Sequence, residues 1–293
     1  MLLRPLRLIP VLALPALAAC EGAVTIDISA TPPEDVESAI LRIQTLRLSR
    51  EDGTTQDIDL GDDFEVDTLD LSQGRTRALI SNEELSTGNY TGATLLLEAE
   101  SDTLDSRLIL DDNSEVSLVL RSGSSLTAQS NFSVNEDDDT NVTLHVDLRS
   151  SLLVDANSAG DRIIAPRMRM IENSAAGSIA GNVDDQVLTD GGCDSDNQPD
   201  LGRVMYVFSG ANISPEEIDG SVPDPITTAL INRDAVNADY VTAFLPAGDY
   251  TLALTCSADL DDPLRFDGIL FVTTRNASVS AGQTTTVNFS LTE

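Results

Sequence analysis

Short runs in which apolar and polar residues alternate recur along most of the chain. Near the start, Val24, Ile26 and Ile28 alternate with polar neighbours. This two-residue period, with Gly, Asn and Asp between the runs, is typical of strands in a sandwich or barrel, so we predict an all-β fold. Further strands are expected near residues 38–48, 58–60, 66–71, 90–99, 108–110, 116–120, 142–148, 163–170, 177–183, 204–208, 226–231, 240–244, 250–256, 269–273 and 286–291. Helical periodicity is weak, and its best candidate is a short turn at 214–217.

The clearest alternation covers residues 142–149. One face would carry Val142, Leu144, Val146 and Leu148, and the other Thr143, His145, Asp147 and Arg149. A strand of this kind commonly packs one face on the core and leaves the other in water. We therefore expect His145, the single histidine of the sequence, to be an exposed strand residue rather than part of a catalytic relay.

The two halves of the chain share a phrase. L-S-T-G-N-Y-T at 85–91 is echoed by L-P-A-G-D-Y-T at 245–251. Gly permits a tight reversal, and the hydroxyl of a half-buried Tyr can reach a backbone group, so we predict that Tyr90 and Tyr250 pin two corners. Because residues 172–176 also have linker composition, two tandem β-sandwiches are predicted, at 23–172 and 177–293. Chance repetition of a common turn is the alternative.

Residues 1–19 form a separate segment. Arg4 and Arg7 precede an apolar run that is interrupted by prolines and ends in Leu17-Ala18-Ala19-Cys20. The order of charged, apolar and small residues is that of an export signal. The L-A-A-C pattern resembles the bacterial lipobox, which implies that Cys20 becomes the first residue and carries the lipid. An ordinary secretory signal is the alternative. The resemblance further implies a sorting rule for double-membrane bacteria, in which Asp just after the lipidated cysteine favours retention in the inner membrane. Here that position holds Glu21, so the outer membrane is expected.

The formal net charge is −32, and removal of Arg4 and Arg7 would make it −34. This charge argues against nucleic acid as a partner, and against the protein body lying on an anionic lipid surface. The acidic residues are scattered over both halves, which favours a solvated acidic surface; a polyanionic binding face is the sharper alternative.

Cys193 and Cys256 remain once Cys20 is assigned to lipid. An even pair in an exported protein predicts one disulfide. Cys256 also shares the strand parity of Tyr250, Leu252 and Leu254, which suits a structural role better than a reactive thiol.

A disulfide between these cysteines would bring two acidic loops together. The acidic residues concerned are Asp190, Asp194, Asp196, Asp200, Asp259, Asp261 and Asp262. Because Ca²⁺ takes several oxygen ligands, they form a candidate calcium site, the only cofactor that the sequence suggests. Unpaired, solvated loops are the alternative.

Other chemistry finds little support in the sequence. There is no Lys, which excludes Schiff-base and Ser-Lys mechanisms, and pairs of carboxylates are expected by chance among 49 acidic residues. We therefore predict a protein that is not an enzyme. Sugar binding usually stacks rings on exposed aromatic side chains. The chain has no Trp, so Tyr206 and Tyr240 would be its candidates.

Several phrases resemble known families. The first half, with its 24–36 opening, the corner at Tyr90, the 142–148 strand and Ala165-Pro166-Arg167, resembles the bacterial lipoprotein domain of unknown function 4382 over about residues 23–172. The second half, with 177–183, 245–250 and 280–284, is similar to transthyretin-like or carboxypeptidase-regulatory-like sandwiches. Neither family implies an active site.

The sequence thus predicts a non-enzymatic, lipid-anchored envelope protein with a structural or interaction role. Its expected partners are the membrane, through the anchor, and an envelope protein or glycan. A ligand-binding module for carbohydrate or peptide, stabilised by calcium, is the alternative function.

Overall fold

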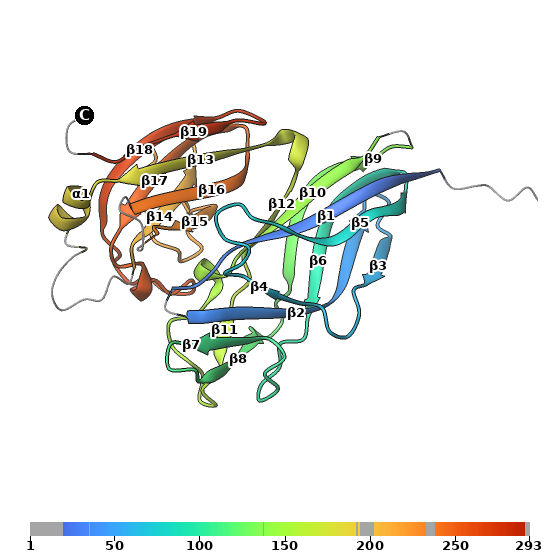
Figure 1. Cartoon of the computed structure of the whole chain (residues 1–293), viewed down its shortest axis with the longest axis horizontal. Coiled ribbons are helices and arrows are strands. Elements are labelled where there is room, and N and C mark those ends of the chain that lie inside the picture. Colours follow the sequence, from blue (N-terminus) through green and yellow to red (C-terminus); the bar gives the residue numbers. More distant parts are fainter. Residues whose placement is uncertain are drawn as a thin grey trace, which may run out of the picture.

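The computed structural model describes residues 20–34, 36–136, 138–191, 193, 202–232 and 238–290. Strands make up 54% of it and helices 6%, which confirms the all-β prediction. Two groups of sheets lie side by side (Figure 1): β1 to β12 belong to one group and β13 to β19 to the other. We call these groups the first half and the second half. None of the helices in the described ranges has the length and apolar character needed to span a bilayer.

The first half is a sandwich of two sheets. The smaller sheet has the order β12-β10-β1-β5, and β1 and β10 run parallel in it. Its strands are β1 (Glu21–Thr31), β5 (Arg77–Ser86), β10 (Thr140–Asp147) and β12 (Met168–Glu172). The larger sheet has the order β11-β8-β7-β2-β6-β9, with β3 and β4 also paired to β2. Its strands are β2 (Val36–Arg50), β3 (Thr55–Asp59), β4 (Glu65–Asp67), β6 (Gly88–Leu97), β7 (Arg107–Leu110), β8 (Glu115–Leu120), β9 (Leu126–Val134) and β11 (Arg162–Ile164).

A single aliphatic core joins these two sheets. Ile26 and Leu144 come from the smaller sheet, and Leu41 and Leu46 from the larger; all are fully buried. Burying such side chains supplies about 2 kcal/mol each, and it needs the alternating positions that the sequence shows. This core forms the sandwich on which the polar residues described below are mounted.

The second half is built from two sheets of its own. One has the order β16-β13-β19 and the other β15-β14-β17-β18. The strands are β13 (Ala176–Val183), β14 (Val204–Ser209), β15 (Thr227–Leu230), β16 (Ala238–Pro246), β17 (Gly248–Thr255), β18 (Phe271–Val279) and β19 (Thr284–Thr286). The only described α-helix is α1 (Asp185–Asp190), and short 3₁₀ turns occur at η1 (Arg149–Ser151), η2 (Asn173–Ala175) and η3 (Ala258–Leu260).

Strands β14 and β17 are buried on both faces of their sheet. Val207 and Leu252 face the core shared with β13 and β16, while Tyr206 and Ala253 belong to a separate buried cluster on the opposite face. A strand that is buried on both sides has no water-facing set of residues. The outer face of this sheet is already covered, and Tyr206 on that face is hydrogen-bonded to Arg149 of the first half.

The two predicted tyrosine corners are confirmed. Tyr90 donates its hydroxyl to Ser86 O at 2.9 Å, and Tyr250 donates to Pro246 O at 2.6 Å. In each case the carbonyl lies four residues earlier, across the glycine turn that joins two strands. The pairing of β6 with β9 also shifts register between Tyr90 and Gly92, which marks a bulge there.

Three details differ from the sequence prediction. The single strand expected at 163–170 is two strands, β11 and β12, which belong to different sheets because Pro166 cannot donate to a ladder between them. β5 and β9 were not predicted at all. Residues 214–217 form no helix; the helical turn is α1, which Asp184 precedes at the N-cap position.

Candidate functional site

The polar face of β10 points at the second half and not at water. Every residue from Val142 to Asp147 is buried. The expectation that this face would be solvated is wrong. Thr143 bonds Asn173, His145 lies beside Thr31 and Arg169, and the start of β15 covers Asp147. We call this contact zone the seam; buried charged residues of both halves lie there, among them Asp147, Arg149 and Asp261.

Asp147, at the end of β10, is the acceptor of the first cluster at the seam. Its Oδ2 accepts hydrogen bonds from Thr228 N at 2.6 Å and Thr227 Oγ1 at 3.1 Å. The Thr228 hydroxyl lies 3.0 Å from Oδ1, which also accepts from Ser150 N at 3.0 Å. All these donors are uncharged. The carboxylate, only 3% exposed, is therefore stabilised by aligned dipoles from both halves. We call Asp147, Ser150, Thr227 and Thr228 the Asp147 cluster.

His145 lies one step along the same face and is 5% exposed, so the expected exposed position is wrong. Its Nε2 is 3.2 Å from Thr31 Oγ1, and that hydroxyl donates to Thr228 O at 3.0 Å. This pattern assigns the ring proton to Nε2. Nδ1 has no hydrogen-bond partner in the described structure. Burial, and then the nearby Arg169 guanidinium, hold the pKa of His145 well below its usual value, which keeps the ring neutral.

Arg149 forms the second cluster, which has the opposite charge at its centre. Its Nη1 donates to Tyr206 OH at 3.2 Å, its Nη2 donates to Ala258 O, and its Nε lies 3.4 Å from Glu34 Oε1. The guanidinium carbon also lies 5.6 Å from the centroid of the Tyr206 ring. Tyr206 in turn donates to Asp261. We call Glu34, Arg149, Tyr206 and Asp261 the Arg149 cluster.

Burial dominates the electrostatics of the Arg149 cluster. It raises the pKa of Asp261 to about 6, although hydrogen bonding from Tyr206 and the charge of Arg149 act in the other direction. It also raises the pKa of Tyr206. Burial alone would lower the pKa of Arg149, but Tyr206, Glu34 and Asp261 raise it above its ordinary value. Arg149 is therefore the permanent charge around which the other groups are arranged.

Two further arginines extend the seam. Arg167 forms an ion pair with Asp224 at 2.8 Å and donates to Pro225 O. Arg169, on β12, donates to Ala243 O at 2.6 Å and to Phe244 O at 3.3 Å. Phe244 has a φ of 57°, and the β13–β16 register shifts beside it, so a bulge turns two consecutive carbonyls toward Arg169. Burial lowers the pKa of Arg169 to about 10.

Clefts remain along the seam. One has a volume of about 460 Å³ and lies between Pro32, Pro33 and Glu34 of the first half and Leu230 and Ile231 of the second. Smaller ones, of about 310 and 250 Å³, border the Arg149 cluster and the Asp147 cluster respectively. The seam thus combines dense polar contacts with space for water or a small ligand.

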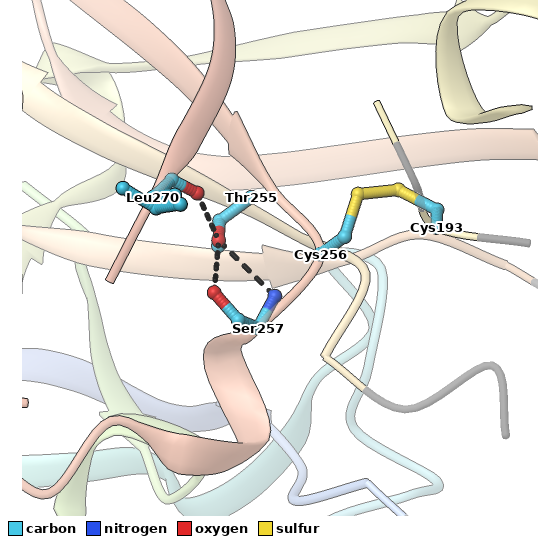
Figure 2. Close-up of a disulfide and its surroundings, with 5 residues drawn as sticks. All are labelled: Cys193, Thr255, Cys256, Ser257 and Leu270. Atoms are coloured by element: carbon cyan, nitrogen blue, oxygen red, sulfur yellow. Dashed lines mark hydrogen bonds between the residues drawn. A yellow bond between two sulfur atoms is a disulfide. The ribbon is translucent and has the colours of Figure 1, made fainter. Parts of the chain in front are cut away.

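The predicted disulfide is present. Figure 2 shows the bond between Cys193 and Cys256 at the end of β17. Beside it, Thr255 Oγ1 accepts from Ser257 N at 3.2 Å and donates to Leu270 O at 2.8 Å. The disulfide therefore sits where the chain leaves β17, and the adjoining loop is held to the residue that precedes β18.

The candidate calcium ligands are not gathered by the described structure. Asp194, Asp196 and Asp200 lie outside the described residues. Asp190 is exposed on α1. The carboxylate of Asp261 accepts from Ile218 N as well as from Tyr206, and that of Asp262 accepts from Val154 N. Within the described ranges no three acidic, His or Cys side chains form a group that could hold a metal ion. Calcium binding stays a prediction.

Tyr206 and Tyr240, the candidates for stacking on a sugar, are both fully buried. The hydroxyl of Tyr240 donates to Val287 O at 2.8 Å. Neither ring can meet a carbohydrate in this structure. Cys20, in contrast, is exposed and is the free cysteine of the three.

Comparison with known proteins places the first half. Residues 21–166 match the family model described as Domain of unknown function (DUF4382). The predicted resemblance is confirmed over this range, which includes β1 to β11 and therefore His145, Asp147 and Arg149. The DUF4382 match ends before Arg167 and β12, and the resemblance of the second half to transthyretin-like domains stays a prediction. A search of curated proteins returns no match.

Solved structures give only remote similarities. The TIE protein of Bacillus anthracis is 12% identical with a TM-score of 0.21; the alignment covers 92% of this chain and 33% of that protein, so the chain spans a third of its length. The minor pilin GBS52 of Streptococcus agalactiae is 11% identical with a TM-score of 0.21, covering 91% of this chain and 94% of the pilin. The fimbrial anchor protein Mfa2 of Porphyromonas gingivalis is 14% identical with a TM-score of 0.18, covering 84% and 83%. TM-scores of this size assign no role to the chain.

Proposed function

We propose that this chain is a lipid-anchored, non-enzymatic protein of the bacterial cell envelope, in which two β-sandwiches act as one structural or interaction body at the outer membrane. The observation that carries the proposal is the state of Cys20. It follows the apolar segment ending in Leu17-Ala18-Ala19, it is exposed, and its thiol is free while the other two cysteines are paired. A lipid attached there would leave the folded body intact. Glu21 supports the outer membrane as the destination.

The use of the reactive side chains supports a structural role. His145, Asp147 and Arg149 are the groups that acid–base or electrostatic catalysis would require, and all three are buried at the seam. Their hydrogen bonds link the two halves, as in the contacts of Asp147 with Thr228 and of Arg149 with Tyr206. Polar groups arranged in this way fix the relative position of the two sandwiches.

The experiment is to express the full chain in a double-membrane bacterium and to determine the mass of the processed amino terminus. We expect Cys20 to carry acyl chains and the protein to fractionate with outer membranes. Cys20→Ala should release the protein from the membrane fraction, whereas the matched control Cys193→Ala with Cys256→Ala should stay attached. An unacylated protein that is recovered from the medium would overturn the proposal.

A second candidate function is the capture of a small carbohydrate or peptide in the cleft between Pro33 and Leu230. Its volume of about 460 Å³ and its position between the first and the second half are typical of ligand sites. Thermal-shift screening against sugars and short peptides tests this function. A stabilising compound whose effect is lost in Leu230→Trp, which would fill the cleft, and kept in Leu264→Trp, at an exposed position, would support it. A screen without a stabilising compound would contradict it.

A further inference from the structure

Cys20 is joined to the folded body without a linker. Glu21 is already the first residue of β1 and is paired with Ser86 on β5. The carbonyl of Cys20 itself accepts a hydrogen bond from Thr87 N at 2.9 Å. A lipid on this cysteine would therefore be attached to a residue that the sheet already holds.

Three turns surround Cys20 at this end of the first half. The β5–β6 turn contacts Cys20 through Thr87. The β2–β3 turn is hydrogen-bonded to the start of β6, just after the β5–β6 turn. Glu51 N donates to Asn89 O at 3.0 Å, and Asn89 Nδ2 donates to Glu51 Oε2 at 2.8 Å. The β9–β10 turn lies against β1, because Asn135 O occupies the space where Gly22 would carry a side chain. We call Cys20 and these three turns the Cys20 end.

Negative charge covers the Cys20 end. The exposed acidic residues there are Glu21, Glu51, Asp52, Glu136, Asp138 and Asp139. Arg50 lies among them, and its guanidinium donates to Thr87 O at 2.9 Å and lies 3.4 Å from Tyr90 OH; the six carboxylates outnumber this one cation. Within about 10 Å, the Debye length in 0.1 M salt, these carboxylates would feel the charge of a lipid surface.

The second half lies away from this end. In Figure 1 the start of β1 is at the right-hand end of the longest axis and α1 is at the left-hand end. The seam, in turn, fixes the second half to the first through Asp147, Arg149 and Arg167. The second half therefore lies at the end of the body away from Cys20, and no linker separates Cys20 from β1.

We propose that the Cys20 end is a membrane-facing surface that rests directly on a bilayer with zwitterionic headgroups, and that it holds the second half away from the membrane. This inference rests on the proposed lipid anchor. Beyond the anchor, the inference states that the Cys20 end is the face that meets the lipid and that no linker separates this face from the bilayer. It also states that anionic headgroups are disfavoured. Lipidation supplies the attachment, so no basic patch is required.

The chain offers clean reporters for a test. It has no Trp, and Cys20 is its free thiol, so a maleimide lipid in phosphatidylcholine vesicles can be coupled to the chain that begins at Cys20. Single tryptophans are placed at the Cys20 end, as Glu136→Trp or Asp139→Trp, and on α1, as Gln186→Trp; all three positions are exposed. Circular dichroism of each variant verifies the fold.

Quenching by lipids with a nitroxide headgroup should be several-fold stronger for Glu136→Trp and Asp139→Trp than for Gln186→Trp. Inserting about eight Gly and Ser residues after Cys20, which reach up to about 28 Å, should reduce this difference. Phosphatidylglycerol in the vesicles should weaken quenching at the Cys20 end at low salt, and high salt should restore it. Equal quenching at both ends, no effect of the insert, or no effect of phosphatidylglycerol would overturn the inference.

Because the lipid is attached chemically, this result does not depend on acylation in cells. Failure of the anchor would appear as an unmodified Cys20 in the mass measurement, with the vesicle experiment unaffected. Failure of the orientation would appear in the quenching, with acylation unaffected.

Discussion

The Asp147 cluster and the Arg149 cluster lie on the same seam but stabilise buried charge in opposite ways. Asp147 is an anion of the first half that receives uncharged N–H and O–H donors, most of them from the second half. Arg149 is a cation of the first half that meets a hydroxyl, a carbonyl and the carboxylate of Glu34. The first cluster relies on dipoles and the second on a chain of coupled charges.

This difference predicts which cluster tolerates change. Removing one neutral donor from the Asp147 cluster costs one hydrogen bond, and the other donors still stabilise the carboxylate. Coupled charges leave an uncompensated ion when one member is removed, which costs more than the pair contributes. The Arg149 cluster should therefore be the more sensitive of the two.

The largest effect is expected for Arg149→Met. The substitution keeps an apolar stem but leaves Glu34 and Asp261 without their cation, so the free energy of unfolding should fall by about 3–5 kcal/mol. Urea unfolding measures it. The matched control is Arg47→Met, which removes an ion pair to Asp57 between side chains that are 40% and 47% exposed and should cost less than about 1 kcal/mol. Equal losses for the two variants would contradict the role of burial.

Asp147→Asn should cost less, about 2–3 kcal/mol. The amide nitrogen of Asn would face a donor from Thr228 N or Ser150 N, and a backbone N–H cannot reverse its polarity as a hydroxyl can. The same unfolding experiment applies, with the exposed Asp155→Asn as the control. A loss larger than that of Arg149→Met would reverse the proposed order of the two clusters.

The two clusters should also respond to pH with opposite signs. His145, beside the Asp147 cluster, has a lowered pKa, so the folded protein excludes a proton that the unfolded chain binds below about pH 6.5, and stability falls as the pH drops through that value. The pKa of Asp261 is raised from 3.8 to about 6, so on acidification the folded protein binds a proton at a higher pH than the unfolded chain does. The stability that this protonation contributes is full below about pH 3.8 and is lost as the pH rises through 6.

Stability measured at pH 8 and pH 5 separates these contributions. His145→Gln should lose less stability on acidification than the unchanged protein, and Asp261→Asn should lose more. The other acidic groups contribute the same background to all three proteins. If both substitutions moved the pH dependence in the same direction, the opposed signs would be refuted.

Periodicity and turn chemistry carried much of the fold prediction. The positions of Tyr90 and Tyr250 after glycine turns predicted their backbone hydrogen bonds, and the parity of Cys256 fitted a structural disulfide. β5 was missed because residues 77–86 do not alternate; it is an edge strand with Asn82 at a φ of 51° and shifted register against β1. All of these features are local, so they can be predicted where the local sequence alternates or carries a turn motif, and they are missed where it does not.

The seam could not be predicted in the same way. The alternation at 142–149 distinguishes two faces but does not say what covers the polar one. Arg149, Asp147 and Arg167 each meet a seam partner more than fifty residues away. These partners, Tyr206, Thr228 and Asp224, have no special spacing in the sequence. The sequence offered one indication of the seam, which is that Asp147 and Arg149 lie two residues apart on the same face. Only the three-dimensional arrangement shows that each belongs to its own cluster.

The smallest expected effect belongs to the residue that links His145 to the Asp147 cluster. Thr31 Oγ1 donates to Thr228 O and accepts from His145 Nε2. Thr31→Val keeps the shape of the side chain and removes both bonds, so unfolding should become easier by about 1 kcal/mol. Because His145 would then lack a partner at both nitrogens, its pKa should change and the stability difference between pH 8 and pH 5 should differ from that of the unchanged protein. Ser133→Ala, which removes a bond to Asn89 at the exposed Cys20 end, is the control that should leave this difference as it is. An unaltered pH dependence in Thr31→Val would mean that His145 acts independently of the seam.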